Sequence, residues 1–137
     1  MNRDQVVDLN ICVSSLPEAR QAIIGSAANA GIEGEDLWAI VSAVFEACVN
    51  AVTHGTKDEA TPARLMVWVD TDKYKAVVQD HGKGCPLNTN IPMPSPASNR
   101  GRGIPLMNLL MDEVRFDNNN GCRVTLTKYL NSKDKQT

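Results

Sequence analysis

The chain has 137 residues, of which 42% are hydrophobic and 22% are charged, and its formal net charge is -2 at pH 7. We expect residues 1–137 to form one domain with a substantial core and a frayed tail over 130–137. Acidic and basic residues are mixed without a basic block, which argues against direct nucleic-acid binding. No apolar run is expected to cross a membrane, and the polar N-terminus lacks signal-peptide features, so we expect a cytoplasmic location.

The four cysteines lie far apart and lack the spacing of metal ligands. They are Cys12, Cys48, Cys85 and Cys122. We expect reduced thiols, with a disulfide pair as the less favoured alternative.

The N-terminal segment predicts a strand followed by a helix. Apolar residues alternate over residues 7–13, which is the period of a half-buried strand. Ser15 and Glu18 have the spacing of a capping box, and the helix that follows would run to about residue 29. Gly31 would close this helix.

A second helix is predicted over residues 36–55, which contain no proline and no internal glycine. Gly55 stands where a left-handed C-cap belongs. Glu46, Asn50 and His54 are spaced by four, so they share one side of the helix. A carboxylate and an amide are costly to bury without partners, so this side is either a site or the solvated face of an ordinary core helix.

Two strands are predicted over residues 64–69 and 74–79, and their short connection favours an antiparallel hairpin. The second strand ends at Asp80, which is followed by Gly82 and Gly84. A carboxylate at a strand end can accept a hydrogen bond from an exocyclic amine, which is one way to select adenine. The glycines permit close approach of a flat ligand, although such a cluster also occurs in ordinary turns.

Residues 85–99 are rich in proline and predict a loop without regular structure, either a functional lid or disordered filler. Gly101 and Gly103 then open a short apolar helix over residues 105–111. Backbone N–H groups at a helix start bind phosphate oxygens, and Arg102 adds positive charge. The glycines fit neither a P-loop nor the dinucleotide-binding fingerprint.

The last part of the chain predicts a hairpin. Strands over residues 113–116 and 122–129 flank Asn118-Asn119-Asn120-Gly121, a strong turn signal.

The motifs occur in a recognisable order: Glu46-x-x-x-Asn50, Asp80-x-Gly82-x-Gly84, a proline-rich loop, and Gly101-x-Gly103. This order resembles the histidine-kinase-like ATPase (GHKL) superfamily of bacterial histidine kinases, the ninety-kilodalton heat-shock chaperone, type II topoisomerases and MutL. Residues 45–55, 101–107 and 110–114 further resemble the small anti-sigma-factor serine/threonine kinases of bacteria. The resemblance covers nearly the whole chain, from the first strand to Tyr129.

The resemblance implies a two-layer α/β (α+β) sandwich, in which a mixed, mostly antiparallel sheet carries helices on one face. It implies ATP and Mg²⁺ as cofactors, with Asn50 as a metal ligand and Glu46 as the catalytic base. Asp80 would bind the adenine amine, with room made by Gly82 and Gly84. The phosphates would be surrounded by Arg100, Gly101, Arg102, Gly103 and Ile104.

The sequence also departs from the family pattern. Cys122 follows Gly121 where a threonine commonly helps to hold adenine, and a thiol is a weak hydrogen-bond partner. Ile104 stands where leucine or phenylalanine is usual. The loop lacks a threonine-lysine pair near the phosphates, for which Arg100 could substitute.

The function implied is a serine kinase that sequesters a transcription regulator and phosphorylates an anti-sigma-factor antagonist. Its partners would be a sigma factor and that antagonist, bound by a homodimer, with Arg20 as a possible contact. The alternative is a non-catalytic, nucleotide-gated binding protein. A detached histidine-kinase catalytic domain is less favoured, because the chain shows no histidine-bearing dimerisation segment.

Overall fold

The structure is a computed structural model of the chain, and it describes residues 4–55, 61–85 and 103–130. Its helices are α1 (Leu16–Asn29), α2 (Gly34–Asn50) and α3 (Gly103–Leu110), with a 3-10 turn η1 (Val13–Ser15) and a π-helical turn η2 (Ala51–Gly55). Its strands are β1 (Asp4–Ile11), β2 (Ala63–Val69), β3 (Lys73–Gln79), β4 (Glu113–Asn118) and β5 (Cys122–Tyr129).

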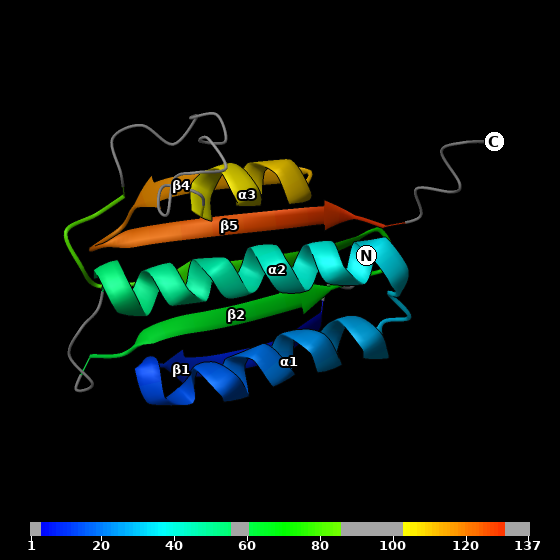
Figure 1. Cartoon of the computed structure of the whole chain (residues 1–137), viewed down its shortest axis with the longest axis horizontal. Helices are drawn as coiled ribbons and strands as arrows, with labels where there is room; N and C mark the ends of the chain where they lie inside the picture. Colours follow the sequence, from blue (N-terminus) through cyan, green and yellow to red (C-terminus); the bar gives the residue numbers. More distant parts are fainter. Residues whose placement is uncertain (1–3, 56–60, 86–102, 131–137) are drawn as a thin grey trace, which may run out of the picture.

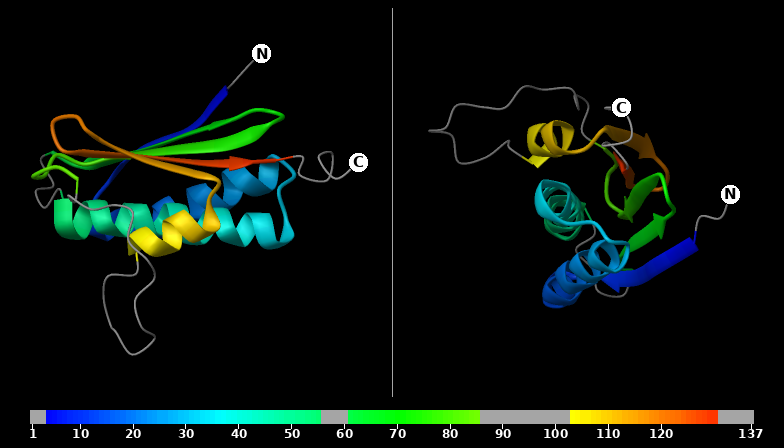
Figure 2. Two further views of the ribbon diagram at one scale, coloured as in Figure 1. Left: turned by 90° about the horizontal axis from the view of Figure 1, so that it is seen from above. Right: turned by 90° about the vertical axis from the view of Figure 1, so that its right-hand side faces the viewer.

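The strands form one sheet in the order β1-β2-β3-β5-β4, and each of its four pairings is antiparallel. The three helices lie side by side on one face of this sheet (Figure 1), and the two layers are plain in the side views (Figure 2). The predicted two-layer sandwich is therefore confirmed, but the sheet of the described residues is antiparallel throughout and not mixed. Because β5 lies between β3 and β4, the end of β3 and the start of β5 are adjacent in space.

The core lies between the sheet and α2. Alternate residues of β2 and β3 face the helices, and Leu65, Val67 and Ala76 have no exposed surface. Val44 and Cys48 of α2 belong to the same core cluster and are equally inaccessible. Apolar alternation in the sequence therefore identified the face of each strand that is buried, as expected for a half-buried sheet.

A partly buried hydrogen bond joins α1 to the sheet. The Ser26 hydroxyl donates to the Ile23 carbonyl at 3.0 Å and lies 2.7 Å from the Tyr74 hydroxyl, so Tyr74 is the donor in that second bond. Tyr74 is fully buried, and burial raises its pKa above the ordinary value of 10.0.

The start of α1 differs from the prediction. The Ser15 hydroxyl accepts the Cys12 backbone N–H at 2.9 Å, so it does not cap α1, and the predicted capping box with Glu18 is wrong. The reason is the 3-10 turn η1, which separates β1 from α1. Gly31 follows the end of α1 with φ +81°, as predicted for a left-handed terminus.

The end of the second helix also differs. The chain turns with π-helical geometry from Ala51, and Gly55 is not among the described glycines with positive φ, so the predicted left-handed C-cap is wrong. By length and composition alone, Gly34–Gly55 could cross a membrane, which the sequence analysis did not expect. Half of the apolar window is buried within the protein, which accounts for its composition.

The predicted hairpins are present. Lys73–Gln79 pairs with β2, and the β4–β5 turn contains Asn120 and Gly121 with φ of 55° and 129°. Leu130 donates its N–H to the Asp72 carbonyl at 2.7 Å, and residues 131–137 of the predicted tail lie outside the described residues. Residues 56–60 and 86–102, which hold most of two predicted loops, also lie outside them.

Candidate functional site

A pocket of about 450 Å³ opens between the C-terminal end of α2, the first turns of α3 and the sheet. Its lining comes from three places: Ala47, Asn50, Ala51, His54 and Gly55 of α2 and η2; Val78, Asp80, Phe116, Cys122 and Val124 of the sheet; and Lys83, Gly84, Cys85, Ile104 and Met107 of the remaining wall. This volume is in the range of small-molecule sites.

Asp80 is held at the floor of the pocket by backbone groups. Its Oδ1 atom accepts the N–H groups of Gly82 and Cys122, each at 2.9 Å. Its own N–H donates to the Cys122 carbonyl at 2.9 Å. The residue is only 8% exposed, so these bonds satisfy a carboxylate that would otherwise be costly to bury. Its orientation is therefore fixed before any ligand binds.

Glycines allow three backbone segments to approach at Asp80. A Cβ added at Gly55 would lie 2.2 Å from Asp80 Oδ2, and one added at Gly82 would lie 2.8 Å from the Gly55 Cα. A Cβ at Gly121 would lie 2.2 Å from the Asp80 carbonyl oxygen. Gly82 was predicted, with Gly84, to allow close approach of a flat ligand, but the space beside it is occupied by the Gly55 backbone. Gly55 and Gly121 were given turn roles, because their neighbour in space is distant in the sequence.

The wall after Asp80 is fixed to the β4–β5 hairpin. Gly84 has φ +115°, and an added Cβ would lie 2.7 Å from the Asn118 side-chain oxygen. That oxygen accepts the Cys85 N–H at 2.8 Å. Gly84 is thus required both by its backbone conformation and by the space available.

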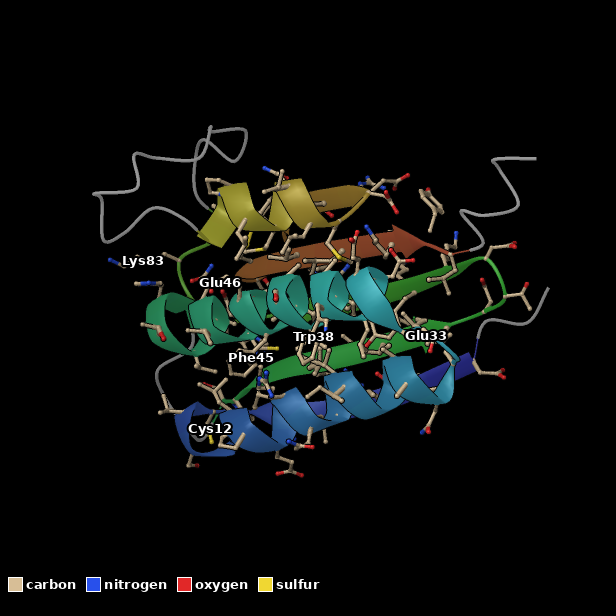
Figure 3. All side chains as sticks on the ribbon, turned by 45° about the vertical axis from the view of Figure 1, so that its right-hand side comes forward. Cys12, Glu33, Trp38, Phe45, Glu46 and Lys83 are labelled. Carbon is tan, nitrogen blue, oxygen red and sulfur yellow. A yellow bond between two sulfur atoms is a disulfide. The ribbon has the colours of Figure 1, made fainter. Side chains whose placement is uncertain are left out.

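On the helical side, Asn50 and Asp80 line the same pocket, so the first two sequence motifs meet in space. The π-helical turn begins directly after Asn50, and such turns are frequent at functional sites. Glu46 is half-buried one turn before Asn50 and lies on the side of α2 nearer to α3 (Figure 3). In the described part of the chain, Glu46 is not among the pocket-lining residues.

The third motif is only partly described. Gly103 begins α3, and Ile104 in its first turn lines the pocket, as does Met107. Arg100, Gly101 and Arg102, which the sequence analysis placed at the phosphates, lie outside the described residues.

Sequence reasoning missed the role of Gln79. Its side chain is 9% exposed, and its Nε2 donates to the carbonyls of Asp80 at 2.7 Å and Asn119 at 2.9 Å. Its Oε1 accepts from Arg123 Nε at 3.0 Å. Gln79 therefore fastens the end of β3 to the β4–β5 turn. No spacing in the sequence signals this, because the partners lie 40 and 44 residues away.

The expectation of four reduced thiols is also wrong. Cys85 and Cys122 form a disulfide across 37 residues, because the loop after β3 passes the start of β5. Cys12 and Cys48 are free, and burial raises the pKa of the Cys48 thiol to about 12. Among the residues that the structure describes, no group of three or more His, Cys, Asp or Glu side chains could hold a metal ion.

Residues 12–128 match the family model of the histidine kinase-like ATPase domain. The chain belongs to the histidine kinase-like ATPase family. The matched region includes every residue that lines the pocket, so this pocket is part of the ATPase domain.

Within this family, the chain is similar to several bacterial serine-protein kinases. The chain is 33% identical over 122 residues to the serine-protein kinase RsbW of Bacillus velezensis and 32% identical over 122 residues to that of Bacillus subtilis. It is 32% identical to the serine-protein kinase RsbW of Bacillus licheniformis, again over 122 residues. Each of these comparisons covers 82% of this chain and 76% of the relative. The predicted resemblance is therefore confirmed.

Proposed function

We propose that this protein is an ATP-dependent serine kinase that also sequesters a transcription regulator. The observation that carries the proposal is that Asn50 and the fixed carboxylate of Asp80 line one pocket in a chain related to serine-protein kinases. Asp80 would accept a hydrogen bond from the adenine amine through Oδ2, since Oδ1 is already held by two backbone N–H groups.

The residues of the pocket fit Mg²⁺ bound with a nucleotide. Asn50 offers one amide oxygen, and the described residues contain no acidic cluster that could hold the ion alone. The remaining ligands would therefore be phosphate oxygens and water, which Mg²⁺ commonly retains. When bound, the ion would neutralise charge on the phosphates. Gly82, whose N–H holds Asp80, and Gly84, which lines the pocket, would place backbone close to the base. Arg100, Gly101, Arg102, Gly103 and Ile104 would surround the phosphates.

Glu46 would act as the general base. It would take the proton of a partner's serine hydroxyl as that oxygen attacks the γ-phosphorus, and ADP would leave. Its place one turn before Asn50 on α2 supports this role. The half-buried carboxylate would reach a substrate at the rim of the pocket without contacting the adenine end.

The proposed protein partners are a sigma factor and an anti-sigma-factor antagonist, bound in the cytoplasm by a homodimer. The antagonist is the proposed phosphate acceptor. Arg20, which is half-buried on α1, is proposed as one of the contacts.

The test is a phosphate-transfer assay with MgATP and a purified anti-sigma-factor antagonist from the same organism, read as phosphoserine by mass spectrometry. Glu46→Ala should abolish transfer and leave nucleotide affinity unchanged. Glu35→Ala makes the same change at an exposed site of the same helix and should leave transfer intact. Full transfer by Glu46→Ala would contradict the role of Glu46.

A second candidate function is a non-catalytic binding protein that selects partners by its nucleotide state. Two observations favour it: Glu46 does not line the pocket, and Cys122 offers no hydroxyl. This candidate predicts nucleotide-dependent partner binding without phosphoserine, and Glu46→Ala would then change little in cells.

A further inference from the structure

We propose that the Cys85–Cys122 disulfide is a thiol–disulfide exchange site, whose reduction weakens nucleotide binding in the adjoining pocket. The inference rests on the proposed nucleotide-binding function and adds that the redox state of the disulfide controls nucleotide affinity. Both cysteines line the pocket, whereas Cys12 and Cys48 are free thiols elsewhere. In the proposed cytoplasmic location, disulfides are usually transient and redox-sensing, because cellular reductants keep most thiols reduced.

The disulfide joins two parts of the pocket wall, which differ in how many other bonds hold them in place. Cys122 is bound to Asp80 by two hydrogen bonds of 2.9 Å: its N–H donates to Asp80 Oδ1, and its carbonyl accepts the Asp80 N–H. Cys85 is attached to the hairpin by the disulfide, by its N–H bond to Asn118 and by a 3.3 Å contact from its Sγ to the Asp117 carbonyl. Breaking the S–S bond therefore leaves the contact between Asp80 and Cys122 intact and leaves Cys85 held by two exposed hydrogen bonds in place of a covalent bond.

The segment between the two anchors is short and rich in glycine. His81, Gly82, Lys83 and Gly84 separate the fixed Asp80 from Cys85. Lys83, Gly84 and Cys85 form one wall of the pocket. Glycine has the largest conformational freedom to lose on ordering. In the reduced protein, nucleotide binding must order this wall again, whereas in the oxidised protein the disulfide has already done so.

A small-molecule dithiol supplies the two electrons that reduce the Cys85–Cys122 disulfide. Cys122 is 6% exposed and Cys85 is half-buried, so the attacking thiolate would reach Cys85 Sγ first. Attack forms a mixed disulfide with Cys85 and releases Cys122 as a thiolate, which takes a proton. The second thiol of the dithiol then displaces Cys85, giving two protein thiols and a cyclic disulfide. A small-molecule disulfide reverses the two-electron exchange.

The experiment compares ADP affinity, by calorimetry, of protein oxidised with a small-molecule disulfide and protein reduced with dithiothreitol. Alkylation and mass spectrometry of the same samples identify the state of each cysteine. We expect the oxidised form to bind ADP about three- to tenfold more tightly. Cys85→Ser should bind like the reduced form under both conditions, and Cys12→Ser should respond as the unmodified protein does.

The outcomes separate this inference from the function on which it rests. Equal affinity in two samples of verified redox state, or tighter binding after reduction, would overturn the exchange site and leave the nucleotide site standing. Failure to form the Cys85–Cys122 bond with excess small-molecule disulfide would also overturn it. If neither form binds ADP, the proposed function fails and the inference fails with it.

Discussion

Replacing Gly55 with alanine should disable the pocket by displacing Asp80. The added Cβ would lie 2.2 Å from Asp80 Oδ2, 2.4 Å from its Cγ and 2.8 Å from its Cβ, whereas ordinary contacts lie at 3.4–4 Å. Gly55 does not have positive φ, so an alanine backbone is unstrained there and the effect is that of the contact alone.

The size of the effect follows from the distances. Relieving the 2.2 Å contact needs a shift of about 1 Å, which would break the 2.9 Å bonds from Gly82 and Cys122 to Asp80. Overpacking costs about 1–3 kcal/mol. For a chain of this size we expect the Tm to fall by roughly 5–10 °C. A lost hydrogen bond between Asp80 and the base would weaken nucleotide binding by about tenfold or more.

The assay combines differential scanning calorimetry with ADP titration. Gly25→Ala is the matched control: it lies in α1, and nothing lies within 4 Å of the added Cβ. Helix propensity predicts a neutral effect or a gain of up to about 1 kcal/mol there. A Gly55→Ala protein with unchanged Tm and unchanged ADP affinity would refute the placement of Asp80 against Gly55.

Two further predictions concern the sheet. Tyr74→Phe should lower the free energy of unfolding by about 1 kcal/mol at neutral pH, because it removes the bond to Ser26. Burial raises the pKa of Tyr74 above that of an unfolded tyrosine, which is about 10. The contribution of Tyr74 to the free energy of unfolding is therefore complete below about pH 10 and is lost as the pH rises above that value. Urea denaturation at about pH 7 and pH 11 should show a larger loss in the unmodified protein than in Tyr74→Phe, and equal losses would contradict the buried hydroxyl. Gln79→Leu should destabilise by about 1–3 kcal/mol, since Asn119 and Arg123 lose their partner; an unchanged denaturation midpoint would count against this network.

Local sequence patterns were sufficient to predict which face of a strand is buried. The alternation of Leu65 and Val67 with Arg64 and Met66 identified the two faces of β2, because a strand with one buried face must alternate. The turn at Asn120 and Gly121 was predictable for a similar reason: few residues adopt positive φ readily.

The site was predictable only in part. Asn50 and Asp80 could be placed in one pocket through the family resemblance, because the spacing of their motifs is characteristic. The approach of Gly55 to Asp80 depends on how α2 lies over the sheet, which no local pattern encodes. The Cys85–Cys122 bond likewise follows from the adjacency of β3 and β5, and sequence distance gave no sign of it.

The most direct test of the account is an isothermal titration of the oxidised protein with ATP and with GTP, each in the presence of Mg²⁺, together with Asp80→Asn. We expect one ATP site per chain, at least about tenfold weaker binding of GTP, and a comparable loss of ATP affinity in Asp80→Asn, because a fixed carboxylate selects the adenine amine. Absence of ATP binding, or equal affinity for ATP and GTP with no effect of the substitution, would contradict it.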